Sequence, residues 1–160
     1  MQAWDLAHII THYVNGKGDT VSHKKLQKLL YYVEAWHLVH LGTSIVDEEF
    51  EAWVHGPVVP EVFRKLRGAG FNNIQVTAED FDTVEEEIKA IIDRNSLSSN
   101  QIDLIESVLD KYGPLSSMEL ELLTHNEDPW INARSGLSPH QASNNVIQKD
   151  KIKEYYSAQI

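Results

Sequence analysis

The sequence predicts a mainly α-helical protein: a compact, single helical domain over residues 1–160, built around a central buried helix at about 22–41, with a small β or extended element near 44–55. Three observations carry this prediction. The longest apolar segment is hydrophobic nearly all round a helical wheel, capping boxes precede amphipathic stripes, and only one short stretch alternates like a strand. A chain of 160 residues is long enough to bury one sizeable core.

The first helix is expected over residues 4–15, because Leu6, Ile10 and Val14 recur at helical spacing. The segment 15–19 contains two glycines, an asparagine and an aspartate, which end a helix. We therefore expect one face of this helix to pack on the core and the opposite face to meet water.

The central helix is expected to begin after Ser22, a suitable N-cap, and to end near Gly42, a suitable C′ glycine. Apolar side chains between Leu26 and Leu41 surround it, which is typical of a helix that is buried on most sides. The polar residues of its first turns are predicted to stay exposed to solvent; they are Lys24, Lys25, Gln27 and Lys28.

The extended element follows, because apolar and polar residues alternate from Phe50 to His55. Gly56-Pro57 then requires an irregular turn, and Pro60 suits the first turn of a short helix that ends at Gly68. Residues 71–77 are left open between a short strand and a loop.

Three capping boxes indicate the helices of the second half; they are Thr83–Glu86, Ser98–Gln101 and Ser116–Glu119. The second box opens a clean amphipathic helix that ends at Gly113. Residues 124–145 are rich in Asn, Ser and Pro, so we expect mostly loop, with a turn of helix around Trp130. A final helix is expected near 150–158.

Composition excludes several function classes. The net charge is −10, so a nucleic-acid partner is not expected, and no cysteine is present to form a disulfide or a thiolate metal site. Asp5 interrupts any N-terminal apolar segment, and no uncharged stretch approaches the roughly 20 residues that span a bilayer. We expect a cytoplasmic protein with no membrane contact and no cofactor.

The negative charge is local. Residues 69–110 carry 10 acidic and 2 basic side chains, centred on Glu79, Asp80, Asp82, Glu85, Glu86 and Glu87. One interpretation is a solvated helix start, where carboxylates favour the positive end of the helix dipole. The other is a surface that attracts a basic partner.

Two pairs of histidines invite a metal or catalytic interpretation. His8 and His12 can share a helical face with Asp5, yet a solvated pair is favoured over a metal site. His37 and His40 are predicted to be buried, hydrogen-bonded core residues. A histidine-based metal-binding protein or enzyme that uses His8, His12, Asp5 and His125 is retained as an alternative, although no metal ligand set is predicted.

The unusual local sequences are Leu26-Gln27-Lys28-Leu29-Leu30-Tyr31-Tyr32 and Phe50-Glu51-Ala52-Trp53-Val54-His55-Gly56-Pro57-Val58. Their aromatic side chains, lysines and Gly-Pro turn suit a protein-binding face. They equally suit a core and its turn, and the residues alone leave this open.

The same residues carry a resemblance. Lys25 to Tyr32, Phe50 to Trp53 and Gly56 to Pro60, followed by Leu123-Thr124-His125 and Trp130, resemble the signature of the Panacea or SocA-like antitoxin domain family, which includes phage-associated proteins of the GepA type. The resemblance covers most of the chain, and the acidic block lies outside it.

The resemblance implies an antitoxin, not an enzyme, that neutralises a cognate protein toxin, encoded by an adjacent gene, through direct protein–protein contact. An alternative within the family is a proteolytic adaptor that delivers its toxin to a ClpXP-type protease. No separate DNA-binding domain is expected in this chain. The candidate partner-binding residues, taken as exposed or half-exposed, are Lys25, Lys28, Tyr32, Trp53, His55, Gly56 and Pro57, with His125 and Trp130 added.

Overall fold

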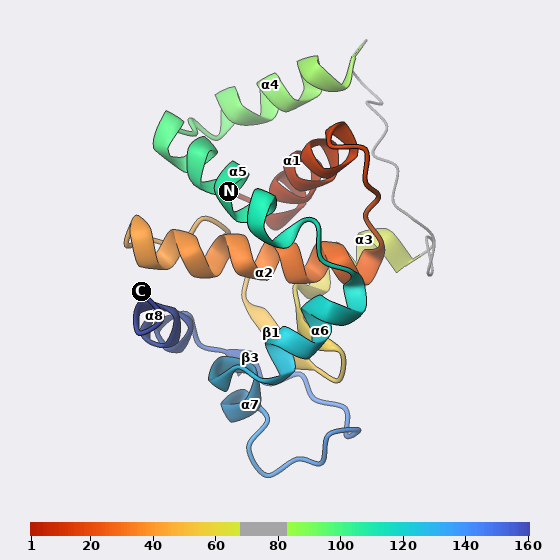
Figure 1. Cartoon of the computed structure of the whole chain (residues 1–160), viewed down its shortest axis with the longest axis vertical. Coiled ribbons are helices and arrows are strands. Elements are labelled where there is room, and N and C mark those ends of the chain that lie inside the picture. The colour runs from red at the N-terminus through yellow and green to blue at the C-terminus, as the bar shows by residue number, and fades with distance from the viewer. Residues whose placement is uncertain (68–82) are drawn as a thin grey trace.

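The protein is described from a computed structural model, which covers residues 1–67 and 83–160 (Figure 1). Helices dominate it, as the sequence predicts. The elements in chain order are α1 (Ala3–Gly16), α2 (His23–His40), β1 (Phe50–Trp53), β2 (Gly56–Val58), α3 (Pro60–Leu66), α4 (Val84–Arg94), α5 (Ser99–Tyr112), α6 (Ser117–His125), α7 (Asp128–Ala133), β3 (Val146–Ile147) and α8 (Lys149–Ser157).

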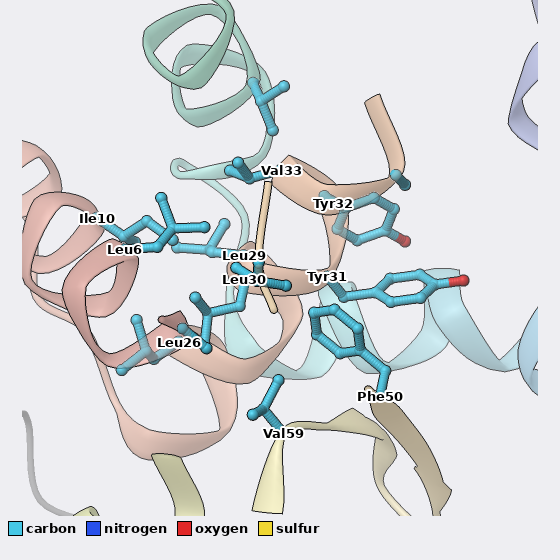
Figure 2. Packing of buried hydrophobic residues seen from close by; sticks show 14 of the residues in the cluster. Leu6, Ile10, Leu26, Leu29, Leu30, Tyr31, Tyr32, Val33, Phe50 and Val59 are labelled. Atoms are coloured by element: carbon cyan, nitrogen blue, oxygen red, sulfur yellow. The ribbon is translucent and has the colours of Figure 1, made fainter. Parts of the chain in front are cut away.

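Helix α2 is the central element: α1 and α5 lie on one side of it, and α8 and the β-sheet lie on the other (Figure 1). Ser22 caps its start by accepting a hydrogen bond from the Lys25 amide at 3.2 Å. The prediction of a helix buried on most sides is confirmed, because α2 packs against α1, α3, α5, α6, α8 and β2. Figure 2 shows Leu6 and Ile10 of α1 facing the leucines of α2.

The sheet has three short antiparallel strands in the order β2-β1-β3. A tight β1–β2 hairpin pairs Trp53 with Gly56, and β3 pairs on the other side of β1. The extended element predicted near 44–55 is therefore confirmed for Phe50 to Trp53, where buried and half-buried side chains alternate. Phe50 packs beneath Tyr31 of α2, with ring centroids 5.4 Å apart (Figure 2).

A buried carboxylate ties the segment after α2 to the core. Glu34 is fully buried and accepts hydrogen bonds from the Ile45 amide at 2.9 Å and the Val46 amide at 3.1 Å. The Ser44 hydroxyl donates to it at 2.5 Å, and the Lys149 ammonium of α8 lies 3.3 Å away. Both oxygens of this charge are therefore fully engaged.

An aromatic cluster joins α2 to α5, α8 and the start of α7. Tyr32 stacks on Tyr112 with ring centroids 4.0 Å apart. The hydroxyls of Tyr32 and Tyr156 both donate to the carboxylate of Glu127, and burial raises the pKa of that carboxyl. This arrangement makes Tyr32 a core residue.

The capping boxes predicted at Ser98 and Ser116 are confirmed, with reciprocal bonds to Gln101 and Glu119. At Thr83 only half of the predicted box forms: the threonine hydroxyl accepts from the Glu86 amide at 3.1 Å. The turn of helix predicted around Trp130 within 124–145 is confirmed as the six-residue helix α7, and Pro129 occupies its first turn. Residues 71–77, with Glu79, Asp80 and Asp82, lie outside the described residues.

The described part of the acidic block divides in two. Glu85 and Glu86 are exposed at the start of α4, as a solvated helix start predicts. Glu87 is only 8% exposed, because one of its carboxylate oxygens lies 2.9 Å from Nδ1 of His8 on α1. Within residues 1–67 and 83–160, no helix combines the length and the apolar character that crossing a bilayer requires.

Candidate functional site

A cavity of about 750 Å³ opens where the start of α2 meets the β1–β2 hairpin, α3 and the loop before β3. We call it the hairpin groove. It is lined by His23, Lys24, Gln27, Lys28, Glu51, Trp53, Val54, His55, Val58, Phe63, Arg67 and residues 142–144. Both unusual local sequences contribute walls, so the fold brings together two motifs, 26–32 and 50–58, that are separate in the sequence.

Aromatic rings form one wall of the hairpin groove. Trp53 of β1 meets Phe63 of α3 edge to face, with centroids 4.8 Å apart, and Phe63 in turn lies 5.0 Å from the ring of His23. The Trp53 indole donates to the Glu51 carboxylate at 2.6 Å. All three rings are half-buried, so they present apolar surface while their positions are fixed by neighbours.

Lys28 lies at the floor of the hairpin groove. Its side chain is almost fully buried, and its ammonium donates to the Pro57 carbonyl at 3.3 Å. Burial lowers the pKa of Lys28 to about 7; the carboxylate of Glu121 opposes that shift, while Lys24 adds to it. At neutral pH this amine therefore exchanges easily between its charged and neutral forms.

Gly56 makes room for that lysine. Its φ of +112° is one that residues with side chains rarely adopt, and a Cβ at this position would lie 2.3 Å from Cε of Lys28. Gln27 fixes the exit of the hairpin, because its side chain accepts from the Val59 amide at 2.9 Å and donates to the Val59 carbonyl at 3.4 Å. The floor of the groove is thus held by backbone geometry.

The outer side of the hairpin rests on α6 and α7. His55, whose side chain is 58% exposed, lies 3.0 Å through Nδ1 from the Glu121 carboxylate. His125 stacks on Trp130 at 4.1 Å, and the Trp130 indole donates to the Trp53 carbonyl at 2.8 Å. Burial lowers the pKa of His125. These contacts support the hairpin from behind.

The structure brings most of the predicted partner-binding residues to one region. Lys28, Trp53 and His55 line the hairpin groove. Gly56 and Pro57 pack around the lysine, and His125 and Trp130 brace the hairpin. The remaining two lie apart: Lys25 forms an ion pair with Asp19 at 3.1 Å, and Tyr32 belongs to the aromatic cluster.

The expected exposure was wrong for several of these residues. Lys25, Lys28, Tyr32, Gly56, Pro57 and Trp130 are buried, as is Gln27 of the first turns. The reason is that α6 and the hairpin cover the start of α2, so its lysines extend their aliphatic stems through packed side chains. Only Trp53, His55 and His125 keep the predicted partial or full exposure.

Sequence reasoning missed several contributors to the hairpin groove, namely His23, Lys24, Phe63, Arg67 and residues 142–144. Phe63 carried a usable signal, because a large aromatic on a seven-residue helix has few neighbours on its own element. The loop 142–144 carried none, since it reaches the groove only through the pairing of β3 with β1.

The described residues do not support a histidine-based metal site. Asp5 is engaged by Arg94 and by Asn95 at 2.9 Å, and His8 is engaged by Glu87. Across the described ranges, no group of three or more potential ligands converges on one point.

The two histidines of α2 differ from each other. His37 is buried as predicted; its ring nitrogens lie 2.6 Å from the Thr43 carbonyl and 3.1 Å from the Gln101 amide. His40 is exposed and stacks on Trp36, so its predicted burial was wrong: it lies in the last turn of α2, where cover from neighbouring elements ends.

Comparisons with known proteins identify one family. The family model described as "Antitoxin SocA-like, Panacea domain" matches residues 26–131, from the first turns of α2 to α7. Antitoxin SocA of Caulobacter vibrioides (strain NA1000 / CB15N) is 32% identical over 122 residues, which cover 69% of this chain and 58% of that relative. No solved structure matches the chain.

Proposed function

Because the chain belongs to the SocA-like Panacea antitoxin family, we propose that it is an antitoxin that neutralises a cognate protein toxin by direct binding. The family match over residues 26–131 carries this proposal. The proposed partner is the product of an adjacent gene, and the two proteins are expected to meet in the cytoplasm. The proposed role is binding, with no chemical step assigned to this chain.

The hairpin groove is the proposed toxin-docking surface. It combines half-buried aromatic rings, which dominate the energetics of protein interfaces, with a small number of polar groups that fix orientation. The backbone around it is held by the Gln27–Val59 hydrogen bonds and by the Trp130 indole. Such a rigid surface loses little conformational freedom when a partner binds.

Co-expression tests the proposed function. Growth of cells that express the adjacent gene product alone should stop, and growth should resume when this chain is expressed with it. The two purified proteins should also co-elute from a size-exclusion column. A gene product that is harmless alone, or toxic in the presence of this chain, would overturn the proposal.

Direct blocking and delivery to a protease differ in what happens to the toxin. If this chain blocks its toxin, the toxin half-life should be the same in cells with and without a ClpXP-type protease. A half-life that shortens only when both this chain and the protease are present would assign the adaptor role instead.

A further inference from the structure

We infer that the hairpin groove receives an acidic side chain of the partner protein together with a neighbouring apolar one, and that Lys28 binds the carboxylate. The inference rests on the proposed function for the identity of the partner. It adds the chemistry by which that partner is recognised. Three independent features of the groove support it.

The charge of the hairpin groove is opposite to that of the chain. The protein carries a net charge of −10, yet the groove is lined by the cationic side chains of Lys24, Lys28 and Arg67. Glu51 is the one carboxylate among the described lining residues, and the Trp53 indole already donates to it. An anionic group therefore finds a favourable site in the groove.

The donors of Lys28 are under-used. An ammonium group has three N–H donors, and within residues 1–67 and 83–160 only the Pro57 carbonyl accepts one, at a long 3.3 Å. The side chain is only 2% exposed, so bulk water does not easily satisfy the others. A carboxylate that enters the groove supplies both an acceptor and the opposite charge.

Apolar side chains of the groove are placed to contact the apolar part of the ligand. Trp53 and Phe63 meet edge to face beside the lysine, and Val54 and Val58 line the groove as well. A side chain with an aromatic or aliphatic body therefore packs here while the carboxylate reaches the floor. This pairing distinguishes an acidic segment of a folded partner from a polyanion, which needs exposed, solvated cations.

Binding should change the protonation of Lys28. Since burial lowers its pKa to about 7, the amine is about half neutral at pH 7, and an adjacent carboxylate restores the charged form. The charged or titratable groups around it are Lys24 and His23 of α2, Glu51 of β1, Glu121 and His125 of α6, His55 of the turn and Arg67, which follows α3. Glu121 favours the charged lysine, and Lys24 opposes it.

Isothermal titration calorimetry of the full chain tests the inference with 3-phenylpropionate as the probe and 3-phenylpropionamide as its neutral match. Titrations in two cationic buffers that differ in their enthalpy of ionisation give the number of protons exchanged. We expect the carboxylate to bind at least about tenfold more tightly than the amide, which corresponds to one charged hydrogen bond. Uptake should be about half a proton at pH 7 and should rise toward one at pH 8.5.

Two variants locate the effect. Lys28→Met preserves the length of the buried stem and should abolish both the preference for the carboxylate and the proton uptake. Lys25→Met is the matched control, because Lys25 is buried on the same helix but pairs with Asp19 outside the groove. Equal binding of the amide and the carboxylate by the wild-type protein, or binding without proton uptake, would overturn the inference whether or not either variant folds.

The co-expression assay separates this inference from the proposed function. If the wild-type chain fails to neutralise the toxin, the proposed function fails, whatever the probe does. If the wild-type chain neutralises it and Lys28→Met neutralises it equally well, the function stands and the assignment of Lys28 is overturned. Dissociation of a homodimer by the probe would assign the groove to a second copy of this chain, which also overturns the inference.

Discussion

Two charged side chains buried in α2, Glu34 and Lys28, have opposite surroundings. In the C-terminal half, Glu34 is surrounded by two backbone amides, the Ser44 hydroxyl and the Lys149 ammonium. In the N-terminal half, Lys28 makes one long hydrogen bond among the described residues and lines a cavity. The two residues lie on one helix and are equally hidden from water.

This difference distinguishes a buried charge that stabilises the fold from one that can still bind a ligand. A buried charge whose partners are complete fixes the elements that supply them, here the segment 44–46 and α8. A buried charge with missing partners destabilises the isolated protein and favours any ligand that completes the set. A residue of the first kind is expected to affect stability when it is replaced, and a residue of the second kind is expected to affect binding.

The largest loss of stability is expected when Glu34, whose hydrogen-bond partners are complete, is replaced. Glu34→Ala leaves the Ile45 and Val46 amides and the Lys149 ammonium without their partner, so we expect a loss of about 3–5 kcal/mol in the free energy of unfolding. Urea denaturation followed by circular dichroism measures it. Lys28→Met should cost far less, and an equal loss in both variants would contradict the comparison.

The next effect concerns the pH dependence of stability. Because the folded-state pKa of Lys28 is about 7 and its ordinary value is 10.5, the unfolded chain binds more protons between these values, and stability rises with pH. From pH 6 to pH 9 the contribution of Lys28 should be about 2–3 kcal/mol.

Urea denaturation of the wild-type protein and of Lys28→Met at both pH values isolates this contribution, since other titrating groups are common to both proteins. The wild-type protein should gain more stability than the variant on going to pH 9. An equal change in the free energy of unfolding for the two proteins would mean that the hydrogen-bond partners of Lys28 are as complete as those of Glu34.

A smaller effect is expected in the aromatic cluster. Tyr32→Phe removes the hydroxyl that donates to Glu127 at 3.1 Å and should cost about 1–2 kcal/mol, because the Tyr156 hydroxyl still donates there. Thermal unfolding measures the loss. Neutralisation of the toxin should be unchanged, and Tyr155→Phe is a half-buried control on α8. If Tyr32→Phe neutralised the toxin less well while its stability was unchanged, Tyr32 would be a partner-binding residue, as first predicted.

The smallest effect on stability is expected at the rim of the groove. His55→Ala removes an exposed side chain whose contact with Glu121 is open to solvent, so the free energy of unfolding should change by less than about 0.5 kcal/mol. Its effect should instead be on toxin binding, measured as co-elution of the two proteins. Met118→Ser, a similarly neutral change of a residue that is 73% exposed on α6 and outside the groove lining, should affect neither property.

Local signals predicted much of the fold. The serine caps at residues 98 and 116 and the all-round apolar surface of α2 depend on neighbours in the sequence, and the structure confirms them. The pairing of β3 with β1 depends on residues almost a hundred positions apart, and no local pattern contains it.

For the candidate site, sequence patterns identified the right segments but assigned the wrong exposure. A lysine is expected at the surface by default, and nothing near Lys28 in the sequence reveals that α6 and the hairpin will cover it. Glu34 illustrates the same difficulty. Its partners come from the segment after α2 and from α8, so its burial follows only from the completed fold.

The contact between Gly56 and Lys28 constrains how this protein can change over evolutionary time. Any side chain at position 56 collides with the lysine stem and also requires an unfavourable backbone conformation. A shorter residue at position 28 would remove the collision and leave the backbone conformation as the remaining constraint on position 56. We therefore expect sequences that keep the lysine at position 28 to keep the glycine at position 56 as well.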